Sequence, residues 1–246
     1  MYQFGYNCPD MTVDPSQGAL PLYLQISEML IRDIVAGRLC DGARLPPERE
    51  MAKSLETSVG TLRNALSELE DRGLLDRRQG SGNYVRVARS PEGIYAFYRL
   101  ELKEGGGLPT ARILDINRLK KPNDLPPFGH ATDAHRIRRL RYLGGIPASV
   151  EEIWLDAGYA DRLDPAEMSH SLYLYYRNAL NLWITGYEDH VTLAPSPEWA
   201  PLEFAPAPGA PCGIVERQSR DRDGVVAEVS RVWFDSDRAR YVVRMR

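Results

Sequence analysis

The stretch from Leu45 to Ser81, LPPEREMAKSLETSVGTLRNALSELEDRGLLDRRQGS, most constrains what this chain can fold into. Two short helical patterns flank a tight connection, a glycine follows the second pattern, and an arginine-rich hairpin comes next. A helix presented by its N-terminal end beside a basic loop is a common way for a protein to enter the major groove of DNA. We therefore interpret this segment as a winged helix-turn-helix.

Capping signals place three helices in this part of the chain. Pro21 opens an amphipathic pattern that ends at Gly37, with apolar residues at intervals of three and four. A second helix begins at Glu48, after two prolines that suit a first turn. Ser58 is a good N-cap for a third helix, which ends at Gly73. We expect a flexible tail over residues 1–19, the winged helix-turn-helix over 20–88 and a linker over 89–93.

Residues 94–246 have a different texture, with short apolar or alternating runs separated by Gly and Pro. Many strands and few helices, not in strict alternation, favour an α+β domain with a mostly antiparallel sheet. One helical pattern interrupts them, from Leu172 to Ile184. The predicted strands are Ile94–Leu102, Arg112–Ile116, Arg136–Leu143, Ala148–Leu155, Cys212–Ser219 and Val225–Phe234.

Charge and cysteine usage limit the class of protein. The net charge of the 246-residue chain is only −3, but between Arg72 and Arg89 five arginines face one acid, Asp76. The three cysteines, Cys8, Cys40 and Cys212, are scattered, which favours reduced thiols in a cytoplasmic protein. No apolar run approaches the roughly 18 residues of a membrane span. We expect no metal and no cofactor.

The first 85 residues contain motifs of a known family. These are the PLYxQI opening from Pro21, the IxxGxxxxGxxLPxERxxA run from Ile34, SxxTxRxAL from Ser58 and GLLxRRQGxGxxV from Gly73. Together they resemble the DNA-binding domain of GntR-type bacterial transcription regulators. The resemblance implies a winged helix-turn-helix fold and binding to double-stranded DNA.

The remainder is similar, more loosely, to the UTRA effector domain of the HutC subfamily. The segments that carry this resemblance are RRLRYLGGIPASVEE, SLYLYYRNALNLWITGYED and RQSRDRDGVVAEVSRVWFDSDRARYVVRM. It implies a chorismate-lyase-like α+β fold that binds a small effector and takes part in dimerisation. Family members usually have a helical segment before the strand at Arg136. Here residues 120–129 read KKPNDLPPFG, which puts the shape of one pocket wall in question.

The resemblance and the residues together give a set of DNA contacts. Arginines suit phosphates or a guanine edge, hydroxyls are short donors near the groove, and glycines let a wing approach the minor groove. The expected DNA-binding residues are Arg49, Ser58, Thr61, Arg63, Arg77, Arg78, Gln79 and Gly80.

Plainer interpretations of these residues remain open. An arginine on an exposed helix is often a solvated charge, Ser58 can simply cap its helix, and Gln79 to Asn83 can be an ordinary turn. There is also a departure from the family pattern. Many relatives have arginine directly after the residue that matches Ser58, whereas this chain has Val59 followed by Gly60. The operator is therefore expected to differ from the commonest half-site of the family or to be bound less tightly.

The effector site is expected around two arginines of one strand. The period of two puts Arg139 and Arg141 on the same side, where two guanidinium groups can clamp a carboxylate or phosphate. The resemblance adds acids, a serine at a helix start and an aromatic ring. The expected effector-binding residues are Arg139, Arg141, Glu151, Ser171, Glu228 and Phe234.

The alternative is that the two arginines pair with Glu151 or Glu228 across the sheet and bind nothing. A second question concerns aromatic residues that could stack on a ligand. We interpret these as core, with one exception allowed. They are Trp154, Tyr173, Tyr175, Tyr176 and Trp183.

The leading functional hypothesis is a ligand-responsive transcription factor, a repressor that binds an inverted repeat as a homodimer and is released by an anionic metabolite such as a sugar phosphate or organic acid. One alternative is an enzyme, because the effector fold is shared with a lyase. The four histidines show no spacing typical of a metal or nucleophile, which argues against it. Another alternative is a constitutive DNA-binding protein with an inert dimerisation domain.

Overall fold

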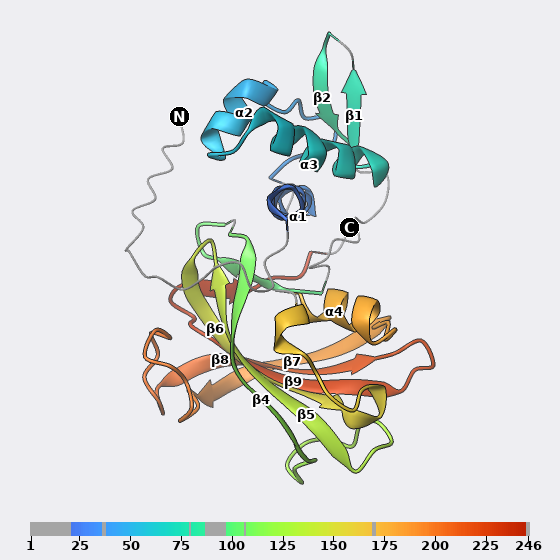
Figure 1. Ribbon diagram of the computed structural model, residues 1–246. Coiled ribbons are helices and arrows are strands. Elements are labelled where there is room, and N and C mark those ends of the chain that lie inside the picture. Colours follow the sequence, from blue (N-terminus) through green and yellow to red (C-terminus); the bar gives the residue numbers. More distant parts are fainter. Residues whose placement is uncertain are drawn as a thin grey trace.

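A computed structural model describes residues 21–35, 38–78, 80–86, 97–105, 107–168 and 171–244. It shows a small helical unit above a larger domain built on a twisted sheet (Figure 1). The tail expected over residues 1–19 and the linker expected over 89–93 lie outside the described residues.

The first unit is a three-helix cluster with a two-stranded hairpin. Its elements are α1 (Leu22–Val35), α2 (Glu48–Ser54), α3 (Val59–Asp71), β1 (Leu75–Arg78) and β2 (Gly82–Val85). The inner face of α3, with Leu62 and Leu66 fully buried, packs against Ile26, Leu30 and Ile34 of α1. Figure 1 shows α1 between α3 and the larger domain, and the β1–β2 hairpin on the far side from that domain. The winged helix-turn-helix predicted from the sequence is confirmed.

The connection between α2 and α3 explains why the two helices meet at a fixed angle. Glu56 adopts a left-handed backbone conformation with φ of 50°. The N–H of Thr57 donates to the carbonyl of Ala52, and that of Glu56 to the carbonyl of Lys53, which is a Schellman ending without the usual glycine. Ser58 then caps α3, because its hydroxyl accepts from the N–H of Thr61 at 3.0 Å.

The second unit contains one antiparallel six-stranded sheet in the order β4-β5-β6-β9-β8-β7. Helix α4 (Leu172–Ala179) and two 3-10 turns cover part of one face, and a short β3–β10 pair lies at the end nearer α1 (Figure 1). The predicted α+β class is confirmed. The elements are β3 (Leu100–Leu102), β4 (Pro109–Lys120), β5 (Asp133–Leu143), β6 (Ile146–Asp156), β7 (Gly186–Pro195), β8 (Pro211–Arg220), β9 (Val226–Phe234), β10 (Ala239–Tyr241) and the turns Ala157–Tyr159 and Pro165–Glu167.

Several predicted boundaries are wrong for identifiable reasons. The helix expected over residues 172–184 ends at Ala179, because Asn181 turns left-handed with φ of 52° and Leu182 bonds back to the carbonyl of Tyr176. Strand β7 was not expected, since as an edge strand it leaves most of its residues exposed and lacks a clear alternation. Of the strand expected over residues 94–102, the described part is a strand only from Leu100 onward.

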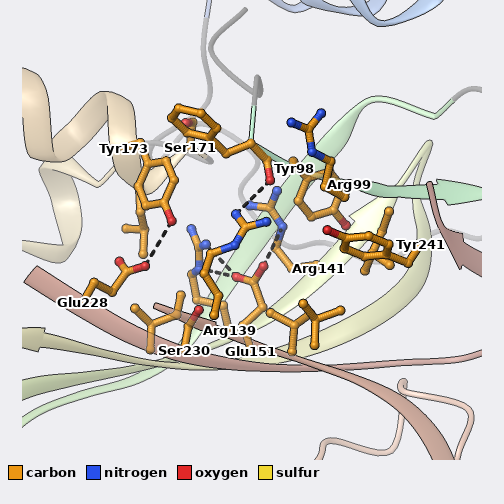
Figure 2. Close-up of a pocket in the computed structure, with 17 residues that line it drawn as sticks. Tyr98, Arg99, Arg139, Arg141, Glu151, Ser171, Tyr173, Glu228, Ser230 and Tyr241 are labelled. Carbon is orange, nitrogen blue, oxygen red and sulfur yellow. Dashed lines mark hydrogen bonds and ion pairs between the residues drawn. The ribbon is translucent and has the colours of Figure 1, made fainter. Parts of the chain in front are cut away.

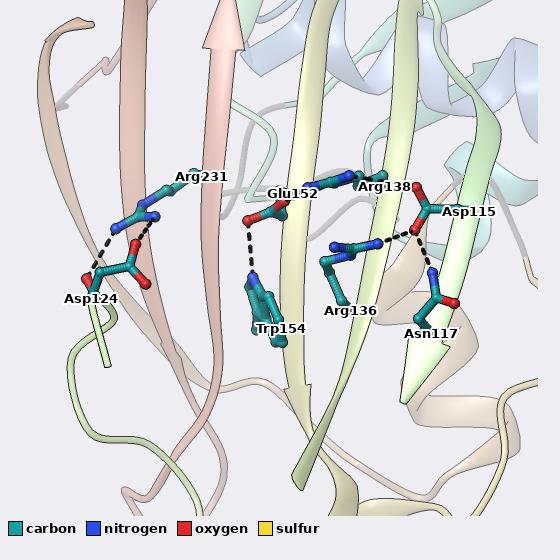
Figure 3. Close-up of polar contacts among 8 residues, drawn as sticks. All are labelled: Asp115, Asn117, Asp124, Arg136, Arg138, Glu152, Trp154 and Arg231. Atoms are coloured by element: carbon teal, nitrogen blue, oxygen red, sulfur yellow. Dashed lines mark hydrogen bonds and ion pairs between the residues drawn. The ribbon is translucent and has the colours of Figure 1, made fainter. Parts of the chain in front are cut away.

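The face of the sheet away from α4 carries a row of matched ion pairs (Figure 3). Arg136 pairs with Asp115 at 3.0 Å, Arg138 with Glu152 at 2.7 Å, and Arg231 with Asp124 at 2.8 Å. The pair Arg138–Glu152 joins residues directly opposite in the β5–β6 register. Each of these three arginines therefore has a carboxylate partner on this face.

We predict that Glu56→Gly stabilises the chain by up to about 1 kcal/mol, because glycine removes the strain of a left-handed residue at a helix end. Glu50→Gly should instead lower the free energy of unfolding by about 1 kcal/mol, because it places glycine within α2. Urea unfolding of both variants measures the two effects. A loss of stability in Glu56→Gly would contradict the strain argument.

Candidate DNA-binding surface and effector pocket

The start of α3 presents two hydroxyls at an exposed surface. Ser58 is exposed, and its hydroxyl lies 2.8 Å from that of Thr61 while it caps the helix. Capping uses a lone pair of the Ser58 oxygen. The two interpretations of Ser58, as a helix cap and as a contact to a DNA phosphate, are therefore compatible. Val59, which stands where many relatives have arginine, packs against the core of the unit and offers no donor.

The arginines expected to contact DNA differ in how exposed they are and in how many protein partners they have. Arg63 projects from α3 with its side chain 62% exposed, and its Nε donates to Glu48 at 2.7 Å. Arg77 of the hairpin is half-buried and donates to Glu48 and to Ser67 of α3, both at 3.1 Å. Arg49 is exposed at the start of α2.

The hairpin has the backbone of a wing that can approach a groove closely. Gly80 and Gly82 adopt φ values of 74° and 123°, which side chains rarely allow. Beside them, Arg78 pairs with Asp76 at 3.0 Å and stacks over the ring of Tyr84 at 4.6 Å. Gln79, the remaining expected contact, lies outside the described residues. Apart from it, the expected DNA-binding residues lie on α2, at the start of α3 and on the hairpin.

In the larger domain a pocket opens on the face of the sheet that carries α4 (Figure 2). Strands β5, β6, β8 and β9 form its floor, the first turn of α4 forms one wall, and residues 97–100 form another. Five of the six expected effector-binding residues line it, and these are Arg139, Arg141, Glu151, Ser171 and Glu228. The sequence argument from strand alternation and a helix start therefore points to residues that the fold brings together.

The two expected arginines share a carboxylate. Arg139 lies directly opposite Glu151 in the register and pairs with it at 2.6 Å, while Nε of Arg141 lies 3.5 Å from the same carboxylate. Burial alone would raise the pKa of Glu151, but the charges of Arg139 and Arg141 outweigh it and hold that pKa below its ordinary range. The pairing considered as an alternative is thus present, yet one carboxylate faces two guanidinium groups.

Glu228 lies on the other side of the floor in a net of hydroxyls. It accepts from Tyr176 at 2.7 Å and from Ser219 and Tyr173 at 3.2 Å. Burial raises the pKa of Glu228 above its ordinary range, although these hydrogen bonds and the charge of Arg217 oppose the shift. The same burial raises the pKa of Tyr173 and of Tyr176. These groups can orient hydroxyls of a ligand rather than attract an anion.

The pocket also contains cations that the sequence argument missed. Arg217 of β8 lies opposite Asp189 and binds it with two contacts of 2.6 Å, and Asp189 also accepts from Tyr241. Arg99 lines the wall and donates to the hydroxyl of Tyr187 at 2.7 Å. Arg217 falls on the pocket face by the same alternation that marked Arg139, so counting alternate residues of the strand at 212–219 could have found it.

Other expected features lie elsewhere. Phe234 is not among the lining residues, because its ring crosses β8 above Gly213 and packs with Leu143 and Ala148. The Pro-rich segment 120–129 does not form a wall of the pocket, since its Phe128 packs on the opposite face against Trp154.

The aromatic residues interpreted as core divide into two groups. Trp154, Tyr175 and Tyr176 are buried, as expected. Tyr173 lines the pocket, and Trp183 is 38% exposed between Arg177 and Arg222. In the part of the chain that the structure describes, no group of acids, cysteines and histidines could hold a metal ion, and no helix is long and apolar enough to cross a membrane.

Together, the fold and these two sites define a regulator with a DNA-binding head and a ligand-binding domain. Comparisons with known proteins give its family. The model for bacterial regulatory proteins of the gntR family matches residues 22–85, and the UTRA domain model matches residues 104–240. This chain belongs to the gntR family of bacterial transcription regulators and has a UTRA domain, so it is a regulator and not an enzyme.

Relatives support this assignment along the whole chain. The chain is 58% identical to the HTH-type transcriptional regulator SmoD of Agrobacterium fabrum, over 93% of this chain and 98% of that protein. It is 28% identical to the transcriptional repressor NagR of Bacillus subtilis, over 92% of this chain and 95% of that protein. It is 27% identical to the mannosyl-D-glycerate transport/metabolism system repressor MngR of Escherichia coli, over 89% of this chain and 94% of that protein.

Two solved structures share the fold. The ligand-binding domain of a GntR-family regulator from Bordetella bronchiseptica matches 61% of this chain and 98% of that chain, with 25% identity and a TM-score of 0.53. The regulator YydK of Bacillus subtilis matches 92% of this chain and 100% of that chain, with 20% identity and a TM-score of 0.51.

We predict that Arg139→Met destabilises the chain by about 3 kcal/mol, because it removes the 2.6 Å partner of the buried Glu151 carboxylate and leaves the longer contact to Arg141 among the described residues. The double variant Arg139→Met/Glu151→Leu should be more stable than Arg139→Met alone. Urea unfolding measures both. As a control, Arg112→Met breaks an exposed pair with Glu203 and should cost about 1 kcal/mol or less. A double variant less stable than Arg139→Met would contradict the argument.

The raised pKa of Glu228 predicts a pH dependence. Below the unfolded pKa of about 4.3 the proton is bound in both states, and the stabilising contribution is fully present. As pH rises through the higher native pKa, the folded state must bury a charge, and that contribution is lost. Relative to Glu228→Gln, the wild-type melting temperature should therefore fall between pH 4.5 and pH 8.

Melting curves of both proteins at steps across that range measure this difference. Glu104→Gln, at an exposed glutamate, is the control and should show a flat difference. A flat or rising difference for Glu228→Gln would show that the charge at this position is not penalised by burial.

Proposed function

We propose that this protein is a ligand-responsive repressor whose residues 20–88 bind DNA and whose residues 94–246 bind an effector and form a homodimer. The operator is an inverted repeat, and binding of an anionic metabolite releases the protein from it. The proposed DNA contacts are Arg49, Ser58, Thr61, Arg63, Arg77, Arg78, Gln79 and Gly80. The proposed effector contacts are Arg139, Arg141, Glu151, Ser171 and Glu228, to which Arg99 and Arg217 are added.

The charge of the pocket supports an anionic effector. Its described lining contains four arginines, Arg99, Arg139, Arg141 and Arg217, and two glutamates, of which Glu228 has a raised pKa. Asp189 balances Arg217 from outside the lining. A carboxylate or phosphate placed over Arg139 and Arg141 would balance the remaining charge, and hydroxyls of a sugar could bind around Glu228 and Ser230. Among the relatives, the name of MngR includes mannosyl-D-glycerate, a sugar joined to a carboxylate.

The observation that carries the regulatory part of the proposal is a contact between the two units. Arg32 of α1 donates to the carbonyl of Leu100 at 2.9 Å and lies over the ring of Tyr98 at 5.4 Å. Arg141, on the pocket side, lies over that same ring at 4.5 Å. A ligand that draws Arg141 toward itself would change the packing of Tyr98. Because Arg32 also packs on that ring, the position of α1 against the larger domain would change as well.

Helix α1 passes such a change to the DNA-binding surface. Its inner face packs on α3, whose N-terminal turns carry Ser58, Thr61 and Arg63. In a dimer that binds two half-sites one helical turn apart, a small rotation of each head is enough to spoil the spacing. A ligand can shift this equilibrium only by its difference in affinity for the two arrangements.

The competing proposal, a constitutive DNA-binding protein with an inert second domain, has less support. An inert dimerisation domain has no need to bury several arginines around a polar pocket, where their desolvation costs stability. Nor does it account for the contact of α1 with the wall of that pocket. DNA affinity that no small molecule changes would favour it.

The function can be tested in two steps with the full chain. Selection from a random pool of double-stranded DNA would identify the preferred sequence, which should be an inverted repeat. A melting-temperature screen with sugar phosphates, sugar carboxylates such as mannosyl-D-glycerate, and their neutral parent sugars would then identify a ligand. The anionic compounds should stabilise the protein and lower its affinity for the selected DNA. No enriched sequence, or stabilisation by the neutral sugars alone, would contradict the proposal.

We predict that Arg32→Gln uncouples the two sites. The variant should bind the selected DNA within about threefold of wild type, and the stabilising compound should still raise its melting temperature. Release of DNA by that compound, followed by fluorescence anisotropy, should be weakened at least about tenfold in effective concentration. Arg38→Gln is the control, because its main partner is Asp33 of α1 at 2.6 Å and its contact with Glu101 is longer, at 3.6 Å; it should retain release. Full release in Arg32→Gln would exclude this route of coupling.

A further inference from the structure

The carboxylate of Glu48 joins the three elements of the DNA-binding surface. Glu48 is the first residue of α2. One of its oxygens accepts from Nε of Arg63 on α3 at 2.7 Å, and the other accepts from Nη2 of Arg77 on β1 at 3.1 Å. Arg77 in turn donates to Ser67 of α3 at 3.1 Å. One acidic side chain thus links two of the arginines that are proposed to contact DNA.

The group is ionised at neutral pH. The hydrogen bond from Arg63 is the main cause that lowers the pKa of Glu48. Burial opposes this shift, but the charge of Arg63 and the hydrogen bonds from Asn83 and Arg77 add to the lowering, so the pKa stays below its ordinary value. A carboxylate in a first helical turn also complements the positive helix end. That role alone does not account for contacts with α3 and the hairpin.

The geometry at Arg63 leaves the recognition end of the side chain available. Glu48 takes the Nε–H, and among the described residues neither terminal nitrogen of Arg63 has a hydrogen-bond partner. The side chain is 62% exposed at the outer face of α3. The two terminal N–H groups of a fixed guanidinium match O6 and N7 of guanine. The same groups can also donate to the oxygens of a phosphate, but that contact carries no sequence information.

We propose that Glu48 is a specificity-determining residue, which holds Arg63 in position to read a guanine and reduces binding to phosphates alone. This inference rests on the proposed DNA-binding function and names how its base reading is achieved. A guanidinium tethered at Nε cannot swing freely to the nearest phosphate, because that movement would break the 2.7 Å hydrogen bond to one oxygen of Glu48. The negative charge itself also opposes close approach of the DNA backbone unless both arginines are in place.

The second oxygen of the Glu48 carboxylate holds the wing, the β1–β2 hairpin, through Arg77. Arg77 is held between Glu48 and Ser67, so the hairpin and α3 keep one spacing. A wing that is fixed relative to the recognition helix makes groove contacts only where the DNA has the matching shape, which adds to specificity without adding affinity.

The experiment compares Glu48→Gln with wild type on the DNA selected by the full chain from a random double-stranded pool. Binding is measured by fluorescence anisotropy on the selected sequence, on versions with each guanine replaced by adenine together with its partner base, and on unrelated DNA. Glu50→Gln is the matched control, because Glu50 lies in the same helix, is exposed and loses the same charge. Melting temperatures show whether each variant is folded.

In wild type one guanine replacement should weaken binding about tenfold or more. In Glu48→Gln that penalty should fall below about threefold, while affinity for unrelated DNA stays the same or rises. In Glu50→Gln the penalty at that guanine should be unchanged. In an Arg63→Ala background, adding Glu48→Gln should produce no further loss of discrimination at that guanine, since Glu48 acts on it through Arg63.

A Glu48→Gln variant that keeps the full guanine penalty would overturn the inference. Equal weakening on selected and unrelated DNA would also overturn it, because that pattern indicates a structural role in the head. If wild type enriches no sequence from the pool, the proposed function itself fails, and this result is distinct from a variant that fails to lose discrimination.

Discussion

The buried pairing of Arg139 with Glu151 is the contact on which the effector pocket depends. Two residues on neighbouring strands face each other in the register, so the backbone ladder brings a cation and an anion to 2.6 Å without help from any loop. Removal of either partner would leave a charge in a region of low dielectric, and this makes the register of β5 against β6 difficult to shift. Arg141 then lies on the same face, beside a carboxylate that is already engaged.

That arrangement gives the two faces of the sheet different uses. On the outer face, Arg138 and Glu152 are also directly opposite and pair one to one (Figure 3). On the pocket face, Arg139 and Arg141 both lie within 3.5 Å of the carboxylate of Glu151 (Figure 2). The same ladder therefore places one-to-one ion pairs on one side and several arginines of the pocket lining on the other. For Arg138, Arg139 and Arg141 the difference comes from the alternation of side chains along β5.

Much of this architecture could be predicted from the sequence, because it depends on local rules. The caps at Ser58 and Gly73, the hairpin glycines and the alternation in β5 are short-range signals, and each corresponds to an observed feature. The end of α4 was missed because Asn181 turns left-handed inside a run that continues the helical pattern. Strand β7 was missed because an edge strand is stabilised by its neighbour rather than by its own pattern.

The candidate sites divide in the same way. Arg139 and Arg141 were found because one strand carries both, whereas Arg99 reaches the pocket from another part of the chain, through tertiary packing that no spacing rule describes. Phe234 was misplaced for a related reason, since the absence of a side chain at Gly213 decides where its ring goes. The role of Glu48 also depends on partners 15 and 29 residues away.

The contacts of Arg32 and Glu48 suggest how such a regulator can separate two properties. Arg32 lies at the junction of α1 with the pocket wall, and we propose that a change there alters the position of the whole head. Glu48 lies within the head, and the proposed effect of a change there is on which base is read. Because α1 and α3 share one core, the proposed displacement of the head is expected to leave the internal geometry around Glu48 unchanged. A ligand can then regulate occupancy of the operator without changing which sequence the protein recognises.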